Sequence, residues 1–361
     1  MRFIATTGNG SMDTYARHLA ESLKMPVIWT DIYENHDFGL PLLAQRSLSL
    51  ARRDARFASQ LRRLGVPVHL PNQHFGRYAA FLNEPYVITV HDLIRYLDMR
   101  SHGLPLIERA DVRDKLYLRA DAVGIRRATA VIANSEATKR DIVRHLAIPE
   151  DRVFVTHLAV DHSHFRPVDR RVADFPYLLF VGTEQPRKNF GTLLEAFSAL
   201  KRDTRLRDLR LVKVGSAGDR DGSLRRATAA TITRLGLERD VLMVGRVPYK
   251  DLPAYYSGAQ CFVMPSLAEG FGYPSLEAMA CGSPVVVSDC DALTEVAQDA
   301  AEIADASSVE SLAESLCRVL LDPARREQLR MRGLRRAAGF TTARMAKATR
   351  AVYEAVPGLG V

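Results

Sequence analysis

Residues 265–290 constrain the fold of this chain more than any other stretch. They read PSLAEGFGYPSLEAMACGSPVVVSDC. Pro274 suits the first turn of a helix, and the Gly-Ser-Pro run at residues 282–284 ends that helix. The valines at residues 285–287 then predict a strand buried on both faces, which is the pattern of a parallel sheet. A loop, a short helix and a buried strand in this order predict an α/β fold.

The same stretch predicts a binding site. Glu269 and Glu277 have seven residues between them and lie on either side of the predicted helix start. Gly270 and Gly272 permit tight or left-handed backbone, and the N–H groups of the first turn attract an anion such as phosphate. A carboxylate accepts hydrogen bonds from sugar hydroxyls, so the stretch predicts a ligand with both phosphate and hydroxyl groups. The alternative is an ordinary loop and helix start with two solvated glutamates.

A second candidate segment is the loop GTEQPRKN at residues 182–189. It follows a predicted strand at residues 177–181 and precedes a predicted helix that ends at residue 200. Arg187 and Lys188 at this turn can neutralise the charge that develops on a departing diphosphate, and the arginine fork suits bidentate phosphate contact. The alternative is a solvated basic pair.

The first half of the chain contains two further candidates. A predicted strand at residues 2–6 leads into a glycine loop that includes Gly10, and then into a helix at residues 12–23. His91 follows directly after a predicted strand at residues 86–90. Both positions lie at the carboxyl ends of strands, where open α/β sheets bind ligands. A plain tight turn and a structural histidine are the alternatives.

Together, these motifs resemble the retaining glycosyltransferases of the GT-B fold, in particular their family 4. The resemblance is carried by the two glutamates with their Gly-x-Gly, Pro and Val-Val-Val context, and by the loop GTEQPRKN, which is similar to that of mannosyltransferases. It implies an α/β chain with two Rossmann-like doubly wound domains that face each other across a cleft. The domains implied are residues 1–168, on the acceptor side, and residues 169–340, which bind the donor. A C-terminal helix at residues 341–361 crosses back to the first domain.

The resemblance also implies roles for single residues. Glu277 binds the ribose hydroxyls, and Glu269 lies beside the donor sugar. Many family members carry an arginine directly after the glycine of the loop, where this chain has Thr183, so diphosphate binding rests on Arg187 and Lys188. The catalytic residues implied are His91, Arg187, Lys188 and Glu269. The donor-binding residues implied are Gly10, Gly182, Arg187, Lys188, Val247, Glu269, Gly270, Phe271, Gly272, Tyr273 and Glu277.

The implied reaction moves a hexose from a nucleotide-diphosphate sugar to a glycan or lipid-linked acceptor, with retention of anomeric configuration. Mannose, and hence GDP-mannose, is the favoured donor. We identify no D-x-D of this sequence as metal-binding, and its cysteines form no Cys-x-x-Cys pair, so we expect no metal and no cofactor. Two alternatives stay open: a nucleotide-sugar epimerase on the same fold, and a noncatalytic binding subunit.

Composition bounds the remaining possibilities. The 361 residues exceed the usual size of a single core and predict two domains. No apolar run is long enough to span a membrane, and no secretion signal opens the chain, so the cytoplasm is the expected compartment. The formal net charge of +8 favours anionic partners, but no nucleic-acid-binding motif accompanies it.

One basic segment, residues 42–64, is a candidate for peripheral contact with the anionic inner face of a membrane. Its apolar side chains are partly segregated from its six arginines, which are Arg46, Arg52, Arg53, Arg56, Arg62 and Arg63. The alternative is a surface helix that packs its apolar side on its own domain and leaves the arginines solvated. The sequence does not indicate an oligomeric state.

Overall fold

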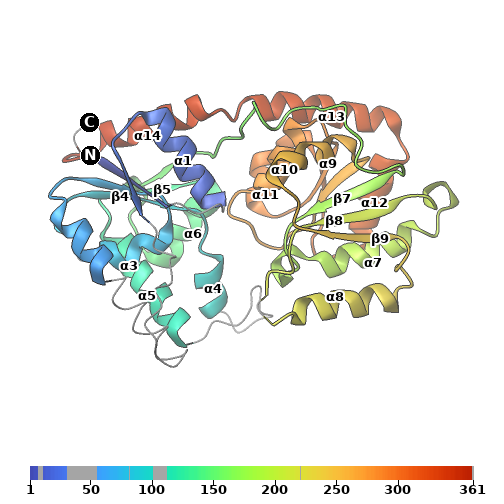
Figure 1. Cartoon of the computed structure of the whole chain (residues 1–361), viewed down its shortest axis with the longest axis horizontal. Helices are drawn as coiled ribbons and strands as arrows, with labels where there is room; N and C mark the ends of the chain where they lie inside the picture. Colours follow the sequence, from blue (N-terminus) through green and yellow to red (C-terminus); the bar gives the residue numbers. More distant parts are fainter. Residues whose placement is uncertain (7–10, 31–54, 81, 101–111, 220, 360–361) are drawn as a thin grey trace. The chain divides into compact units, whose positions relative to one another are not determined.

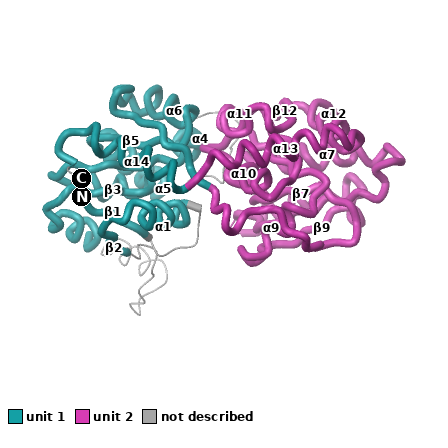
Figure 2. The backbone as a smooth tube through the Cα atoms, turned by 90° about the horizontal axis from the view of Figure 1, so that it is seen from above, with its two compact units in different colours: residues 1–99, 110–159, 342–361 teal, residues 100–109, 160–341 magenta. Residues whose placement is uncertain are grey.

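The structure, a computed structural model, describes residues 1–6, 11–30, 55–80, 82–100, 112–219 and 221–359. The chain forms two compact units (Figure 2). Unit 1 comprises residues 1–99, 110–159 and 342–361, and unit 2 comprises residues 100–109 and 160–341.

Unit 1 is built on a parallel six-stranded sheet with the order β2-β1-β3-β4-β5-β6 (Figure 1). Its central strands are fully buried, as expected for apolar strands covered on both faces. The chain changes direction across the sheet between β1 and β3, which is the topological switch point of this unit. The strands are β1 (Arg2–Thr6), β2 (Val27–Thr30), β3 (Val68–Leu70), β4 (Tyr86–Val90), β5 (Ala130–Ala133) and β6 (Val153–Val155).

Helices cover this sheet. Ser135 caps α6 by accepting a hydrogen bond from the Thr138 N–H. Helices α3 and α5 pack closely, because Gly76 and Gly124 have no side chain at their crossing, and a Cβ at either would collide with the backbone of the other helix. The helices are α1 (Ser11–Leu23), α3 (Gly76–Ala79), α4 (Ile94–Arg100), α5 (Val112–Arg127) and α6 (Glu136–Leu146).

The last helix of the chain, α14 (Thr342–Ala355), belongs to unit 1 and packs against α1. Its Tyr353 hydroxyl lies 2.5 Å from Nδ1 of His69 in β3, and the other ring nitrogen of His69 lies 2.8 Å from the Thr89 hydroxyl. Burial lowers the pKa of His69 to about 3, so this imidazole is neutral. The predicted return of the C-terminal helix to the first domain is confirmed.

Unit 2 contains a second parallel six-stranded sheet, with the order β12-β11-β10-β7-β8-β9. Read along the chain, this is the strand order of a doubly wound dinucleotide-binding fold, with its switch point between β7 and β10. The two sheets confirm the predicted α/β class. The strands are β7 (Tyr177–Val181), β8 (Arg210–Val214), β9 (Val241–Gly245), β10 (Cys261–Met264), β11 (Val285–Ser288) and β12 (Glu302–Ala304).

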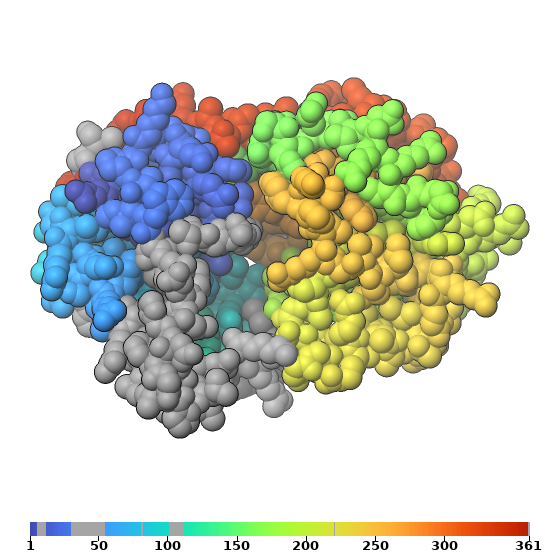
Figure 3. Space-filling view, viewed as in Figure 1, coloured from blue at the N-terminus to red at the C-terminus, as the bar shows by residue number. Residues whose placement is uncertain are grey.

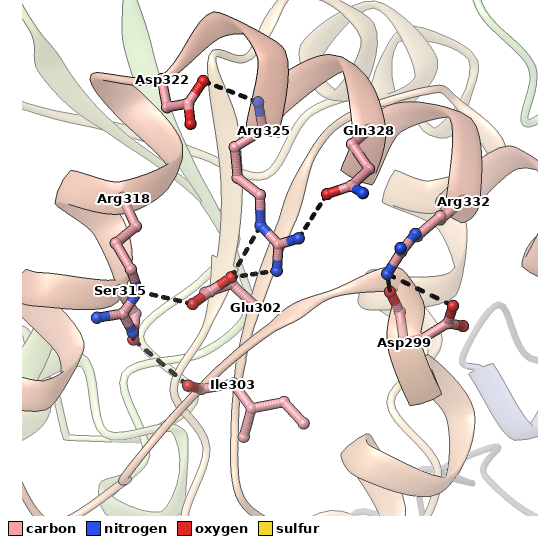
Figure 4. A network of polar contacts seen from close by, with 9 residues as sticks. All are labelled: Asp299, Glu302, Ile303, Ser315, Arg318, Asp322, Arg325, Gln328 and Arg332. Carbon is pink, nitrogen blue, oxygen red and sulfur yellow. Dashed lines mark hydrogen bonds and ion pairs between the residues drawn. The ribbon is translucent and has the colours of Figure 1, made fainter.

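Helices flank this sheet, and in particular α7 packs beside α12 while α10 packs beside α13. The helices are α7 (Phe190–Leu200), α8 (Ser223–Arg234), α9 (Leu252–Gly258), α10 (Tyr273–Ala280), α11 (Asp291–Ala297), α12 (Val309–Leu320) and α13 (Pro323–Ala338). Figure 4 shows how the edge strand β12 is tied to two of them: Glu302 accepts hydrogen bonds from Arg318 of α12 at 2.8 Å and from Arg325 of α13 at 2.7 Å.

The basic segment at residues 42–64 lies only partly within the described residues. Residues 55–63 are helical. Phe57 and Leu61 are buried in the core of unit 1, whereas Arg56, Arg62 and Arg63 are exposed. Over this described part, the large apolar side chains therefore pack on their own domain, and the arginines face solvent.

Candidate functional site

The switch point of unit 2 brings two predicted segments together. The loop after β7 carries Arg187 and Lys188, and the loop after β10 carries Glu269. Because β7 and β10 are parallel neighbours, both loops leave the sheet at the same edge. The Leu267 N–H donates a 2.7 Å hydrogen bond to the Arg187 carbonyl, which joins the loops directly.

The three charged side chains form one cluster. Nζ of Lys188 lies 2.6 Å from one carboxylate oxygen of Glu269, and an Arg187 guanidinium nitrogen lies 3.1 Å from the other. The Glu269 side chain is only 9% exposed. Burial alone would raise the pKa of Glu269, but Lys188 and Arg187 together hold it below its usual value, so the carboxylate stays ionised. Two cations against one carboxylate give the cluster a net positive charge.

Helix α10 begins immediately after this cluster. Gly272 is its N-cap and has φ 99°, in the left-handed region where a side chain is strained. A Cβ at Gly272 would also collide with the Leu293 side chain. Of the two glycines that the sequence singles out for left-handed backbone, Gly270 is not among the described residues with positive φ. The first-turn N–H groups and the helix dipole add partial positive charge beside the cations.

Glu277 lies on α10, in the second turn. The hydroxyl of Tyr256, a fully buried side chain of α9, donates a 2.8 Å hydrogen bond to a Glu277 carboxylate oxygen. Burial raises the pKa of Glu277 to about 7, although the bond from Tyr256 opposes the shift. Glu277 therefore changes charge near neutral pH, unlike Glu269.

A second ionic cluster supports the loop after β7, and sequence reasoning missed it. Lys213 of β8 has no exposed surface, and its Nζ lies 2.9 Å from Oε1 of Glu184. The same ammonium donates to the Gly215 and Ser216 carbonyls, at 2.7 and 2.8 Å. Arg225 of α8 also contacts Oε1 of Glu184, at 2.6 Å.

Helix α8 lies on the surface of unit 2 (Figures 1 and 3), and the Arg225 side chain is 38% exposed. The signal in the sequence was a lysine between apolar residues of a strand, since a buried lysine requires a partner.

Two family models match the chain in sequence. The model described as glycosyl transferases group 1 matches residues 162–336, and the model described as glycosyltransferase family 4 matches residues 12–164. Together they account for nearly the whole chain. The chain belongs to the GT-B glycosyltransferases of this type.

Curated relatives agree with this family. The chain is 35% identical to O-antigen chain mannosyltransferase B of Escherichia coli over 223 residues, and this match covers 59% of the chain and 57% of the relative. It is 32% identical to D-inositol 3-phosphate glycosyltransferase of Kineococcus radiotolerans over 247 residues. This match covers 63% of the chain and 57% of the relative. The chain thus spans little more than half the length of these relatives.

Solved structures share the fold. Sucrose-phosphate synthase from Thermosynechococcus elongatus superposes with a TM-score of 0.77 at 21% identity, over 98% of each chain. Anabaena HepE, in complex with UDP and glucose, superposes with a TM-score of 0.77 at 17% identity, over 98% of this chain and 99% of its own. The GT-B fold predicted from the sequence is confirmed.

Four further residues predicted to bind the donor lie in unit 2 but not in the ionic cluster. Gly182 follows β7 and donates its N–H to the Val214 carbonyl at 2.9 Å. Phe271 is 3% exposed and packs against Phe340, with ring centroids 6.0 Å apart. Tyr273 is the first residue of α10 and is partly buried. Val247 is partly buried after β9, which is the edge strand of the sheet.

His91 belongs to unit 1, where it follows β4 as predicted. Its Nε2–H donates to the Pro71 carbonyl at 2.9 Å, and its backbone N–H donates to Oε1 of Gln73 at 3.1 Å. Burial lowers the pKa of His91 to about 4, so the ring is neutral and Nδ1 is a hydrogen-bond acceptor. Gly10 lies outside the described residues.

Among the described residues, no group of three or more His, Cys, Asp or Glu side chains is placed to hold a metal ion. The expectation that no metal is required stays a prediction. None of the described helices is both long enough and apolar enough to cross a bilayer.

Proposed function

We propose that the chain transfers a hexose, with mannose favoured, from a nucleotide-diphosphate sugar to a glycan or lipid-linked acceptor. GDP-mannose is the favoured donor. The setting is the assembly of a polysaccharide or glycolipid, at the cytoplasmic face of a membrane. The mannosyltransferase relative and the D-inositol 3-phosphate glycosyltransferases support transfer of a hexose.

The observation that carries this proposal is the contact of Arg187 and Lys188 with Glu269 at the switch point, beside the start of α10. The cluster has one positive charge in excess and adjoins the positive end of a helix. A diphosphate satisfies that charge, and Glu277 on the same helix is suited to accept hydrogen bonds from ribose hydroxyls.

In the proposed reaction, the bond between the anomeric carbon and the diphosphate oxygen breaks, and its electron pair leaves with the diphosphate. An acceptor hydroxyl bonds to the anomeric carbon on the same face, and its proton passes to the departing phosphate. Arg187, Lys188 and the first-turn N–H groups of α10 stabilise the negative charge as it grows, without a metal.

The test is a screen of the purified chain against GDP and UDP sugars with lipid-linked and glycan acceptors, read by mass spectrometry. Sugar attached to an acceptor supports the proposal. A changed donor sugar without any acceptor product indicates the epimerase. Donor binding without turnover of any sugar indicates a noncatalytic subunit.

A further inference from the structure

Helix α5 of unit 1 has an unusual exposed face. Val112, Leu116 and Val123 are 76%, 58% and 45% exposed, although aliphatic side chains of this size are normally buried. At 3.6 residues per turn, these three positions lie within about 40° of one another around the helix axis. They therefore form a single apolar stripe along α5.

Cationic side chains surround this stripe. The exposed charged residues of α5 are all basic: Arg113, Lys115, Arg119, Arg126 and Arg127. The two acids of the helix lie on its opposite side, where Asp114 pairs with Arg95 at 2.7 Å and Asp121 pairs with Arg77 at 2.7 Å. The outer face of α5, defined as these five cations and the three aliphatic residues, thus carries no acidic side chain.

The packing of α5 fixes which side faces outward. Gly124 lies against the backbone of Gly76 in α3, with no room for a Cβ. Asp121, which is 3% exposed, accepts hydrogen bonds from the Arg77 backbone N–H at 3.0 Å and from its guanidinium. Rolling the helix to bury its apolar stripe would break these contacts, so the exposure is a property of the fold.

We propose that the outer face of α5 is a docking surface for an anionic lipid bilayer. Aliphatic side chains in a row along a helix can enter the boundary between headgroups and acyl chains, while flanking arginines and lysines reach the lipid phosphates. A nucleic acid or an acidic protein partner would use the cations but leave the aliphatic stripe in water. This inference deepens the proposed function, because a bilayer is where a lipid-linked acceptor is found. It rests on the proposed function only for the identity of that acceptor.

This surface differs from the basic segment at residues 42–64. In the described part of that segment, Phe57 and Leu61 are buried, so its arginines are exposed without large aliphatic side chains beside them. In α5, aliphatic and cationic side chains are exposed together. Attraction by arginines alone is screened by salt, whereas insertion of aliphatic side chains is not.

The test is flotation of the full chain with vesicles of phosphatidylglycerol and phosphatidylcholine, and with vesicles of phosphatidylcholine alone. One variant, Leu116→Ser/Val123→Ser, removes part of the stripe. A second, Lys115→Glu/Arg119→Glu, reverses two charges beside it. The matched control in unit 2 is Arg239→Glu/Leu242→Ser/Arg335→Glu, which changes residues of the same kinds that are also exposed.

We expect the wild type to float with the anionic vesicles, and each α5 variant to reduce the bound fraction about tenfold or more, while the control variant floats like the wild type. The serine variant should lose binding at low and high salt alike. Flotation of the α5 variants at the wild-type level would overturn the proposal. The proposal would also be overturned if only the charge-reversal variant lost flotation, because that result indicates a surface that binds its partner through charge alone.

Donor turnover with a water-soluble acceptor, measured without vesicles, separates this proposal from the proposed function. The α5 variants should keep the wild-type rate in that assay. If the wild type binds vesicles but consumes no donor, the transferase proposal fails and the docking surface stands.

Discussion

The ammonium of Lys213, which has no exposed surface, lies 2.9 Å from the carboxylate of Glu184 and joins the loops after β8 and β7. Glu184 precedes Arg187 by only three residues. The buried pair therefore fixes the loop that carries the two cations proposed to bind the diphosphate.

Lys213→Met should destabilise unit 2 by about 3 kcal/mol, because it leaves the buried Glu184 carboxylate with Arg225 as its remaining charged partner. Urea unfolding measures the loss. The double variant Lys213→Met/Glu184→Gln also removes the buried negative charge and should be more stable than the single variant. Equal stability of wild type and Lys213→Met would contradict a structural role for the pair.

Arg187→Ala and Lys188→Ala should each lower kcat, because each cation is proposed to stabilise charge that grows as the diphosphate leaves. The expected increase in the activation free energy is about 3 to 4 kcal/mol for each variant. Steady-state kinetics with the donor identified in the screen measure the effect, at a temperature where both variants remain folded. Arg207→Ala, at an exposed position of the same unit, is the control. Wild-type rates in both single variants would show that the diphosphate binds elsewhere.

Donor binding should weaken as the pH falls below about 7. Burial raises the pKa of Glu277 to about 7, so the free carboxyl gains its proton on acidification, whereas ribose hydroxyls donate better to the ionised form. Calorimetric titration with the nucleotide-diphosphate sugar from pH 5.5 to 8.5, about three units around that value, measures the slope, because the phosphates of this ligand do not titrate in the range. In Glu277→Gln the slope should vanish. A wild-type affinity that is constant across this range would remove Glu277 from the donor site.

Activity should survive treatment with EDTA, because the cations of the cluster and the N-terminus of α10 are proposed to replace a metal at the diphosphate. The assay compares initial rates before and after chelation and gel filtration. Loss of activity that magnesium or manganese restores would show that the diphosphate is held through a metal.

Local patterns predicted much of the fold. The strand after residues 282–284 and the helix that ends at residue 200, which is α7, lie where the sequence indicated, because their apolar patterns and end signals agree. Helix α5 was not predicted. Its exposed side mixes aliphatic and basic residues, so apolar positions occur all around the helix and no single buried face stands out in the sequence.

The site was only partly predictable. Each of Arg187, Lys188 and Glu269 could be singled out from its local context, but their contact depends on β7 and β10 becoming neighbours in the sheet. Strand order is set by long-range packing, which no local pattern encodes. Likewise, the sequence places Lys213 in a strand, but the carboxylate that allows its burial lies in another segment.

The contact between Tyr353 and His69 also bears on the order of folding during synthesis. His69 and α1 belong to the first part of unit 1, whereas α14 leaves the ribosome after all of unit 2. Until then, His69 and the α1 surface lack the helix that covers them, while unit 2 can already complete its core. We therefore expect unit 2 to reach its native state first, while the nascent unit 1 stays incomplete and accessible to chaperones until the last helix has been synthesised.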